Sequence, residues 1–330
     1  MEKRLDYVDI AKGIGILLVV CSHSDALPLM WLLMGMFVPV FYFCSGYTFS
    51  SKGTLSEAFV RHFRKLFVPY LFFNALLFLA FGHFSLREVA GVCYSRYSLF
   101  PLDISPNVKF LTSGNYPMWF LTSMIVSYLL FYVIVYHERY RWWILSAYAV
   151  ATVAFMYCPI LLPWSIDTAF LTAVFMYTGM LARRHNAMSW NIWWIVLLAF
   201  LYVGIHCIAG DINLSVRMYG TSVAFYFLLG SVGSFLLLWL SRFLEHTLAG
   251  SLFTLLGRHS LTIFSVEMAF IVPAKSLCEY VLPGFAADAP AGSEWTYVAG
   301  LVEIVFALMG GWLLSVVLHK SRFLSRLLQF

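Results

Sequence analysis

The stretch from Asp9 to His23 places three ionisable side chains in an otherwise apolar run. On an α-helix the eleven steps from Lys12 to His23, at about 100° each, bring both side chains within roughly 20° of one face. Asp9 lies one turn before Lys12, on nearly the same stripe. Ionisable groups inside a membrane span are costly and usually face a cavity or a partner. The pattern therefore predicts a pathway or an active site inside a membrane.

The composition indicates a polytopic membrane protein. Hydrophobic residues make up 62% of the 330 residues and charged residues only 11%, whereas soluble domains carry about 25% charged residues. Because a span needs about 20 mostly apolar residues, we expect an all-α fold with about ten transmembrane helices in a single membrane domain, residues 1–330. The segment 82–117 is expected to be a loop or a re-entrant segment. The predicted helices cover residues 6–25, 28–49, 66–82, 118–136, 142–162, 165–182, 190–209, 221–240, 252–274 and 296–318.

The distribution of basic residues predicts the orientation of these helices in the membrane. With a cytoplasmic N-terminus, 16 of the 21 basic residues fall on the cytoplasmic side, and an even number of spans puts both termini there. The net charge of +5 then reflects topology, so no nucleic-acid partner is expected. Six scattered cysteines show no metal-like spacing, and no metal is expected. The basic residues predicted on the outer side are Arg87, Arg96, Lys109, Arg217 and Lys275.

Several short motifs follow one another along the chain. They are Lys12 with His23 after ten intervening residues, the aromatic Ser-Gly segment Phe41 to Tyr47, the basic Pro-Tyr segment Arg61 to Tyr70, Trp119-Phe120-Leu121, and Gly257-Arg258-His259-Ser260-Leu261. In this order they resemble the acyltransferase 3 family of integral membrane acyltransferases, over most of the chain. The first and fourth motifs are closest to the fucose 4-O-acetylase-like branch of that family.

The chain departs from the family pattern at two places. Many members carry a glutamate a few residues after the tryptophan of helix four, where this chain has Ser123 and Met124. Many also place a histidine where this chain has Glu267. The acceptor and the mechanistic details known for the family therefore cannot be assigned directly to this chain.

The resemblance implies transfer of an acyl group, in the simplest case acetyl, from cytoplasmic acyl-CoA to a hydroxyl of a surface or exported glycan. His23 is the candidate general base or acyl relay, because an imidazole with an ordinary pKa of about 6.5 accepts a proton near operating pH. Lys12, about 16 Å away along the helix, would contact the diphosphate or pantetheine arm of the donor. The alternative is that Lys12 neutralises Asp9, as structural support, and that His23 binds a backbone carbonyl.

Other candidates surround this pair. Arg64 and Lys65 would bind CoA phosphates, or else anchor the helix on the cytoplasmic side. Glu267, a lone carboxylate in a predicted span, would orient His23, pair with Lys12 or line the acceptor site.

The remaining candidates concern the acceptor. Asp167 either binds a sugar hydroxyl or caps a helix start, and Asp25 caps the end of the first helix or faces water. Trp119 either stacks on a sugar ring or belongs to an interfacial aromatic belt. Ser45 contributes to the substrate site or, with Gly46, lets two helices approach closely.

A second class of protein fits the same residues. A transporter or exporter of a small polar or lipid-linked molecule could use Lys12, His23 and Glu267 as a substrate or proton path. The two halves of the chain lack matching Gly/Pro-broken helices, which disfavours a secondary transporter. A bacterial inner membrane is the location implied by the family resemblance.

Overall fold

The computed structural model describes residues 5–24, 30–50, 53–82, 85–101, 108–111, 114–281 and 294–328. Its fold is all-α, with a small antiparallel hairpin in which Ile212 faces Tyr219 and Asn213 faces Met218. The helices are α1 (Asp6–Ser24), α2 (Met30–Leu33), α3 (Pro39–Tyr47), α4 (Leu55–Phe81), α5 (Leu86–Tyr94), α6 (Trp119–Tyr136), α7 (Arg141–Met156), α8 (Ile166–Arg184), α9 (Ile192–Ala209), α10 (Val223–Ser241), α11 (Leu248–Arg258), α12 (Ser260–Val281), α14 (Glu294–Lys320) and α15 (Arg322–Leu327). The strands are β1 (Ile212–Asn213) and β2 (Met218–Tyr219).

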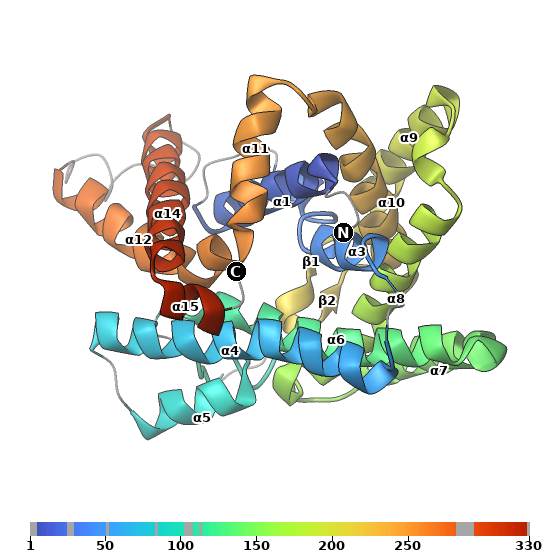
Figure 1. Cartoon of the computed structure of the whole chain (residues 1–330), viewed down its shortest axis with the longest axis horizontal. Helices are drawn as coiled ribbons and strands as arrows, with labels where there is room; N and C mark the ends of the chain where they lie inside the picture. Colours follow the sequence, from blue (N-terminus) through green and yellow to red (C-terminus); the bar gives the residue numbers. More distant parts are fainter. Residues whose placement is uncertain are drawn as a thin grey trace.

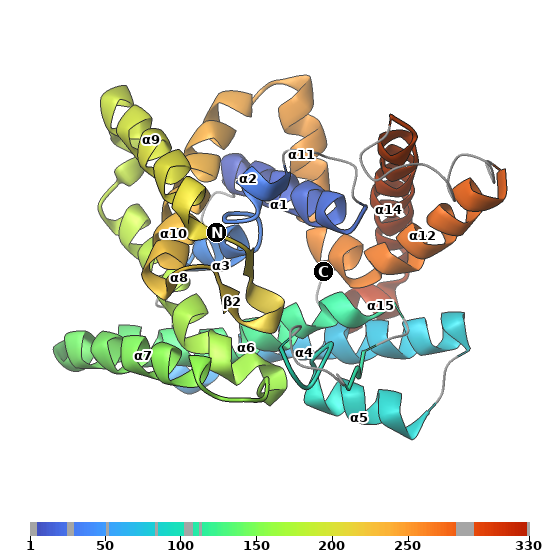
Figure 2. The same ribbon diagram turned by 180° about the vertical axis from the view of Figure 1, so that it is seen from behind.

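Helix α1 lies at the centre of the molecule. Figures 1 and 2 show α4, α6 and α7 along one side, α12 and α14 at one end, and α9 and α10 at the other, with α1 and α3 between them. Helix α1 packs against α3, α10, α11, α12 and α14. A side chain on α1 is therefore enclosed by other helices, which is the setting that an intramembrane ionisable group requires.

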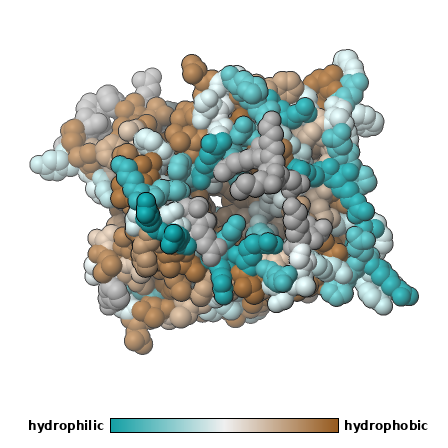
Figure 3. Space-filling view, in the orientation of Figure 1, coloured by the Kyte–Doolittle hydropathy of each residue, from teal (hydrophilic) through white to brown (hydrophobic). Residues whose placement is uncertain are grey.

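Eight helices in the described part of the chain are long and apolar enough to cross a membrane. They confirm a polytopic membrane protein and correspond to eight of the ten predicted spans. The predicted helix 142–162 is shorter in the structure, because α7 ends at Met156. Figure 3 shows hydrophilic residues across the middle of one face and hydrophobic residues along its left-hand and lower margin.

The predicted helix 28–49 is broken, which corrects the sequence analysis. Helix α2 ends at Leu33, turns occupy residues 34–38, and α3 starts at Pro39. Proline has no backbone N–H and is tolerated in the first turn of a helix, so Pro39 favours a new start. In the sequence, the continuous apolar character of the segment favours one helix and masks the signal of Pro39.

Two further helix boundaries differ from prediction. The predicted helix 252–274 is two helices, α11 and α12, which meet at His259. The third helix begins at Leu55 instead of residue 66, because Thr54 and Glu57 form a capping box at its start. The predicted loop 82–117 contains the short helix α5.

Glycines bring the helices around α1 and α3 into backbone contact. A Cβ on Gly257 would lie 1.8 Å from the carbonyl oxygen of Asp9, and one on Gly13 would lie 1.9 Å from the carbonyl oxygen of Phe253. Likewise a Cβ on Gly46 would lie 1.7 Å from the carbonyl oxygen of Met176. The expectation that Gly46 permits close helix approach is therefore confirmed, and α1 is held tightly against α11.

Candidate functional site

The structure brings His23 and Glu267 together. His23, in the last turn of α1, places its Nδ1 atom 3.0 Å from Oε1 of Glu267 on α12. The Glu267 side chain is fully buried, whereas 21% of the His23 side chain is exposed. The two atoms are in close polar contact, but by hydrogen-bond geometry neither they nor the second carboxylate oxygen of Glu267 has a partner among the described residues. Of the three arrangements considered for Glu267, contact with His23 is the one observed.

A cavity of about 410 Å³ opens beside this pair. His23 and Trp119 both line it, so one predicted catalytic residue and one predicted substrate-binding residue share the same space. The His23 ring meets Tyr116 edge to face, with ring centroids 5.2 Å apart. The wall combines aromatic rings with a few polar groups, which come from Ser22, Asn213 and Ser215. Such a lining suits a small polar ligand with apolar faces.

The broken helix and the β-hairpin build the far wall of the cavity. The lining residues Met34, Phe37 and Val38 lie in the turns at residues 34–38, between α2 and α3. Residues 212–216 come from β1 and the turn that follows it. A continuous helix over 28–49 would not present these side chains in this way, so the cavity depends on the break that the sequence analysis did not predict.

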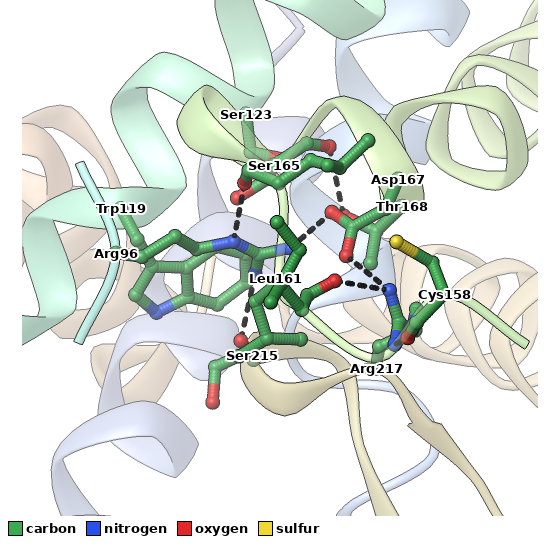
Figure 4. A network of polar contacts seen from close by, with 12 residues as sticks. Arg96, Trp119, Ser123, Cys158, Leu161, Ser165, Asp167, Thr168, Ser215 and Arg217 are labelled. Carbon is green, nitrogen blue, oxygen red and sulfur yellow. Dashed lines mark hydrogen bonds and ion pairs between the residues drawn. The ribbon is translucent and has the colours of Figure 1, made fainter. Parts of the chain in front are cut away.

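Behind the hairpin lies a buried network centred on Asp167. Arg96 and Arg217 reach its carboxylate from two sides (Figure 4), Arg96 at Oδ1 and Arg217 at Oδ2, the latter at 3.1 Å. The side chains of Arg96 and Asp167 are fully buried and that of Arg217 is 2% exposed. Asp167 thus lies in the first turn of α8, as predicted, with both oxygens engaged by arginines.

The two arginines tie three segments of chain together. Arg96 donates to the carbonyl oxygens of Leu162 and Ser215, and Arg217 donates to those of Ile160 and Cys158. Burial lowers the pKa of Arg96, and the adjacent carboxylate of Asp167 opposes that shift. Since Ser215 lines the cavity, the network holds one wall of the cavity in place.

Sequence reasoning did not single out Arg96 or Arg217 as site residues. A signal was nevertheless present, because both belong to the five basic residues on the side that the positive-inside rule leaves poor in charge. A basic residue that departs from that rule needs a partner, and here both share Asp167.

At the other end of α1, Asp9 contacts Arg258 and not Lys12. Nε of Arg258 lies 3.5 Å from Asp9, and its Nη2 atom lies 3.1 Å from Asp6. Lys12 is half-buried, and it forms no ion pair within the described ranges. The expected Lys12–Asp9 pair is therefore not observed, and Asp9 supports the contact between α1 and α11 instead.

The other predicted residues lie away from the cavity wall. Arg64 and Lys65 are exposed on α4, and Arg64 borders a shallow pocket with Arg61. Ser45 is half-buried on α3 and donates a hydrogen bond to the carbonyl oxygen of Phe41 at 2.8 Å. Asp25 lies outside the described residues. The roles assigned to these residues stay predictions.

Both departures from the family pattern lie inside the helical bundle. Ser123, at the place where many members have a glutamate, accepts a hydrogen bond from the hydroxyl of Tyr42 at 2.9 Å inside the bundle. Glu267, at the place of the histidine, supplies a carboxylate to His23.

Comparison with known proteins agrees with the motifs. A family model described as an acyltransferase domain matches residues 5–324, which is nearly the whole chain. Comparison with individually curated proteins gave no significant match. Because the match extends from the start of α1 to α15, the stripe on α1, the cavity and the Asp167 network all fall within it. The chain belongs to the acyltransferase 3 family of membrane acyltransferases.

Proposed function

We propose that the protein is an O-acyltransferase that moves an acyl group, in the simplest case acetyl from acetyl-CoA, to a hydroxyl of a surface or exported glycan. The observation that carries this proposal is the contact between His23 and Glu267 on the wall of an aromatic-lined cavity. A buried carboxylate beside a partly exposed imidazole is an arrangement that prepares a histidine to act as a general base.

The pair can move a proton in a defined direction. Nδ1 of His23 lies 3.0 Å from Glu267, so a proton on Nδ1 would face the carboxylate and the lone pair would reside on Nε2. Nε2 would take the proton of the acceptor hydroxyl as its oxygen attacks the thioester carbonyl. A C–O bond forms, the C–S bond breaks, and the CoA thiolate takes up the proton. Glu267 is a positioning residue that favours this tautomer and the imidazolium that follows.

The lining of the cavity supports the acceptor side of the proposal. Trp119 offers an aromatic face on which a sugar ring can stack, and Ser215 and Asn213 offer groups for its hydroxyls. Asp167 would act on the acceptor indirectly, through Arg96 and Ser215, because its own oxygens are engaged by arginines.

The donor side is proposed from charge and position. Lys12, half-buried and about 16 Å from His23 along α1, is suited to contact the pantetheine or diphosphate part of CoA. Arg64 and Lys65, exposed on α4, are suited to its phosphates. We also propose that the protein belongs to the fucose 4-O-acetylase-like branch of the family and that it resides in a bacterial inner membrane.

The test uses the purified full chain in detergent with labelled acetyl-CoA and a surface-glycan extract. We expect the wild type to release CoA and transfer label, and His23→Ala to lose about 100-fold or more of the rate, because general bases contribute roughly 10²–10⁴-fold. Glu267→Gln should lower kcat roughly 10- to 100-fold with little change in KM, because it alters the orientation of His23 and not the cavity.

The matched control is Glu279→Gln, which changes an exposed carboxylate on the same helix as Glu267. Equal rates for wild type and a folded His23→Ala protein would contradict the role of His23. If neither protein consumed acetyl-CoA but vesicles containing the wild type moved a solute without changing it, the transporter interpretation would replace this one.

A further inference from the structure

A second pocket lies away from the cavity at His23. It has a volume of about 330 Å³ and opens where α6 and α8 end and α7 begins. Its lining residues are Phe49, Ile134, Val135, Glu138, Arg141, Tyr177, Met180, Arg183 and Arg184. By the distribution of basic residues this end of the helices is cytoplasmic.

The pocket carries an excess of positive charge. Three arginines and one glutamate give it a formal charge of +2. The C-termini of α6 and α8 and the N-terminus of α7 together subtract only about half a charge. The pairing of Glu138 with Arg184 is loose, at 3.9 Å, and both side chains are more than half exposed. The pocket is therefore attractive to an anion.

Arg141 is the pocket residue with an unsatisfied hydrogen-bond donor. Its Nε atom is buried and has no hydrogen-bond partner among the described residues. Its guanidinium group lies over the ring of Trp142, 5.2 Å from the ring centroid. Buried donors are normally satisfied, so Arg141 lines the cationic pocket with one guanidinium nitrogen still without a partner.

The surroundings favour a lipid as the source of that acceptor. Tyr140, Trp142 and Trp143 are exposed around the start of α7, and the two tryptophans are at least 70% exposed. Exposed tryptophan and tyrosine side chains are typical of the headgroup level of a membrane. Apolar side chains, among them Phe49 and Met180, line the same pocket as the arginines. This combination of apolar and cationic walls matches a lipid phosphate with its attached glycerol.

We propose that this pocket binds the phosphate of an anionic phospholipid headgroup in the cytoplasmic leaflet, with Arg141 and Arg183 as its principal ligands. Basic pockets between membrane helices on this side are suited to such headgroups. The site is separate from the proposed acyl-transfer chemistry. It would secure the ends of α6 and α8, whose other ends bear Trp119 and Asp167.

The test measures the thermal unfolding midpoint of the delipidated full chain in detergent. Probes added in turn are phosphatidylglycerol, phosphatidylcholine and free CoA. We expect phosphatidylglycerol to raise the midpoint in a saturable manner, because a ligand that binds only the folded state stabilises it. In the Arg141→Gln/Arg183→Gln double variant we expect the apparent affinity to fall about 30-fold.

Two variants make the result specific. Arg139→Gln removes a nearby arginine that does not line the pocket and should respond as the wild type does. Arg141→Lys keeps the charge and should retain most of the response, which separates loss of binding from loss of folding. The proposal is overturned if phosphatidylcholine or CoA alone reproduces the shift, if no probe shifts the midpoint, or if the double variant still responds fully. Acyl transfer is not measured, so failure here leaves the proposed function untouched.

Discussion

At the scale of single residues, three buried carboxyl groups each lie beside a basic side chain. Glu267 meets His23, Asp9 meets Arg258, and Asp167 meets two arginines. The last group is the most enclosed, and its remaining guanidinium N–H groups donate to backbone carbonyls of the cavity wall and the neighbouring loop. A buried charge whose partner is removed costs far more than the pair gains, so this network constrains the cavity wall strongly.

The Asp167 network makes a stability prediction. Asp167→Asn leaves two buried guanidinium groups without a carboxylate, and we expect it to lower the free energy of unfolding by about 3–5 kcal/mol. The measurement is thermal or denaturant unfolding of the purified chain in detergent. The matched control is Arg184→Gln, which breaks an exposed pair and should change stability by less than about 1 kcal/mol. Similar unfolding midpoints for Asp167→Asn and the wild type would contradict the structural role.

At the scale of elements, the position of the His23 end of α1 depends on how closely that helix packs on α11. Gly13 and Gly257 let the two backbones touch, and Arg258 on α11 pairs with Asp9 on α1. The position of His23 relative to Glu267 follows from this packing, because α12 begins immediately after α11 ends. Any displacement of α1 relative to α12 would change the 3.0 Å distance between Nδ1 of His23 and Oε1 of Glu267.

The contact between α1 and α11 can be tested with a pair of glycine substitutions. Gly257→Ala places a Cβ 1.8 Å from the backbone oxygen of Asp9, so we expect loss of stability and a drop in acyl transfer. Gly204→Ala, in the interior of α9, meets nothing within 4 Å and should be neutral or stabilise by about 0.5–1 kcal/mol. Unfolding midpoints and transfer rates of the two variants provide the comparison. Equal behaviour of both would show that the close approach of the helices is not needed.

At the scale of the whole molecule, the number of spans and the distribution of charge agree. The eight long apolar helices, together with α7 and the broken α2–α3 segment, make ten spans in the described part of the chain, an even number. An even number of spans puts the two termini on one side, as the basic residues predict. With ten spans, the His23 end of α1 lies on the side opposite the termini, whereas the ends of α6 and α8 at the arginine pocket lie on the same side as the termini.

Thiol labelling across α9 tests this orientation. In a cysteine-free background, Asp211→Cys should react with a membrane-impermeant maleimide added to intact cells, and Asn186→Cys should react only after the membrane is opened. Both positions are exposed and lie at opposite ends of α9. The reverse pattern would invert the topology and, with it, the assignment of donor and acceptor sides.

The sequence alone predicts several residues of the candidate site. The spacing of Lys12 and His23 depends only on the helical repeat, and α1 is one unbroken helix from Asp6 to Ser24. The sequence predicts a functional or paired role for Glu267, because a lone carboxylate in an apolar run needs a partner. Ordered motifs indicated the family, and the match over residues 5–324 shows it.

What the sequence by itself determined is therefore the fold class, the membrane environment, the family and the identity of the groups on α1. Those depend on composition and on spacing within one element, which local geometry converts directly into position. Only the tertiary structure decided that Glu267 meets His23, that Arg96 and Arg217 share Asp167, and that the chain breaks between α2 and α3 to form a cavity. Each of these joins elements far apart in the chain, where partner choice depends on how helices pack and not on any local pattern.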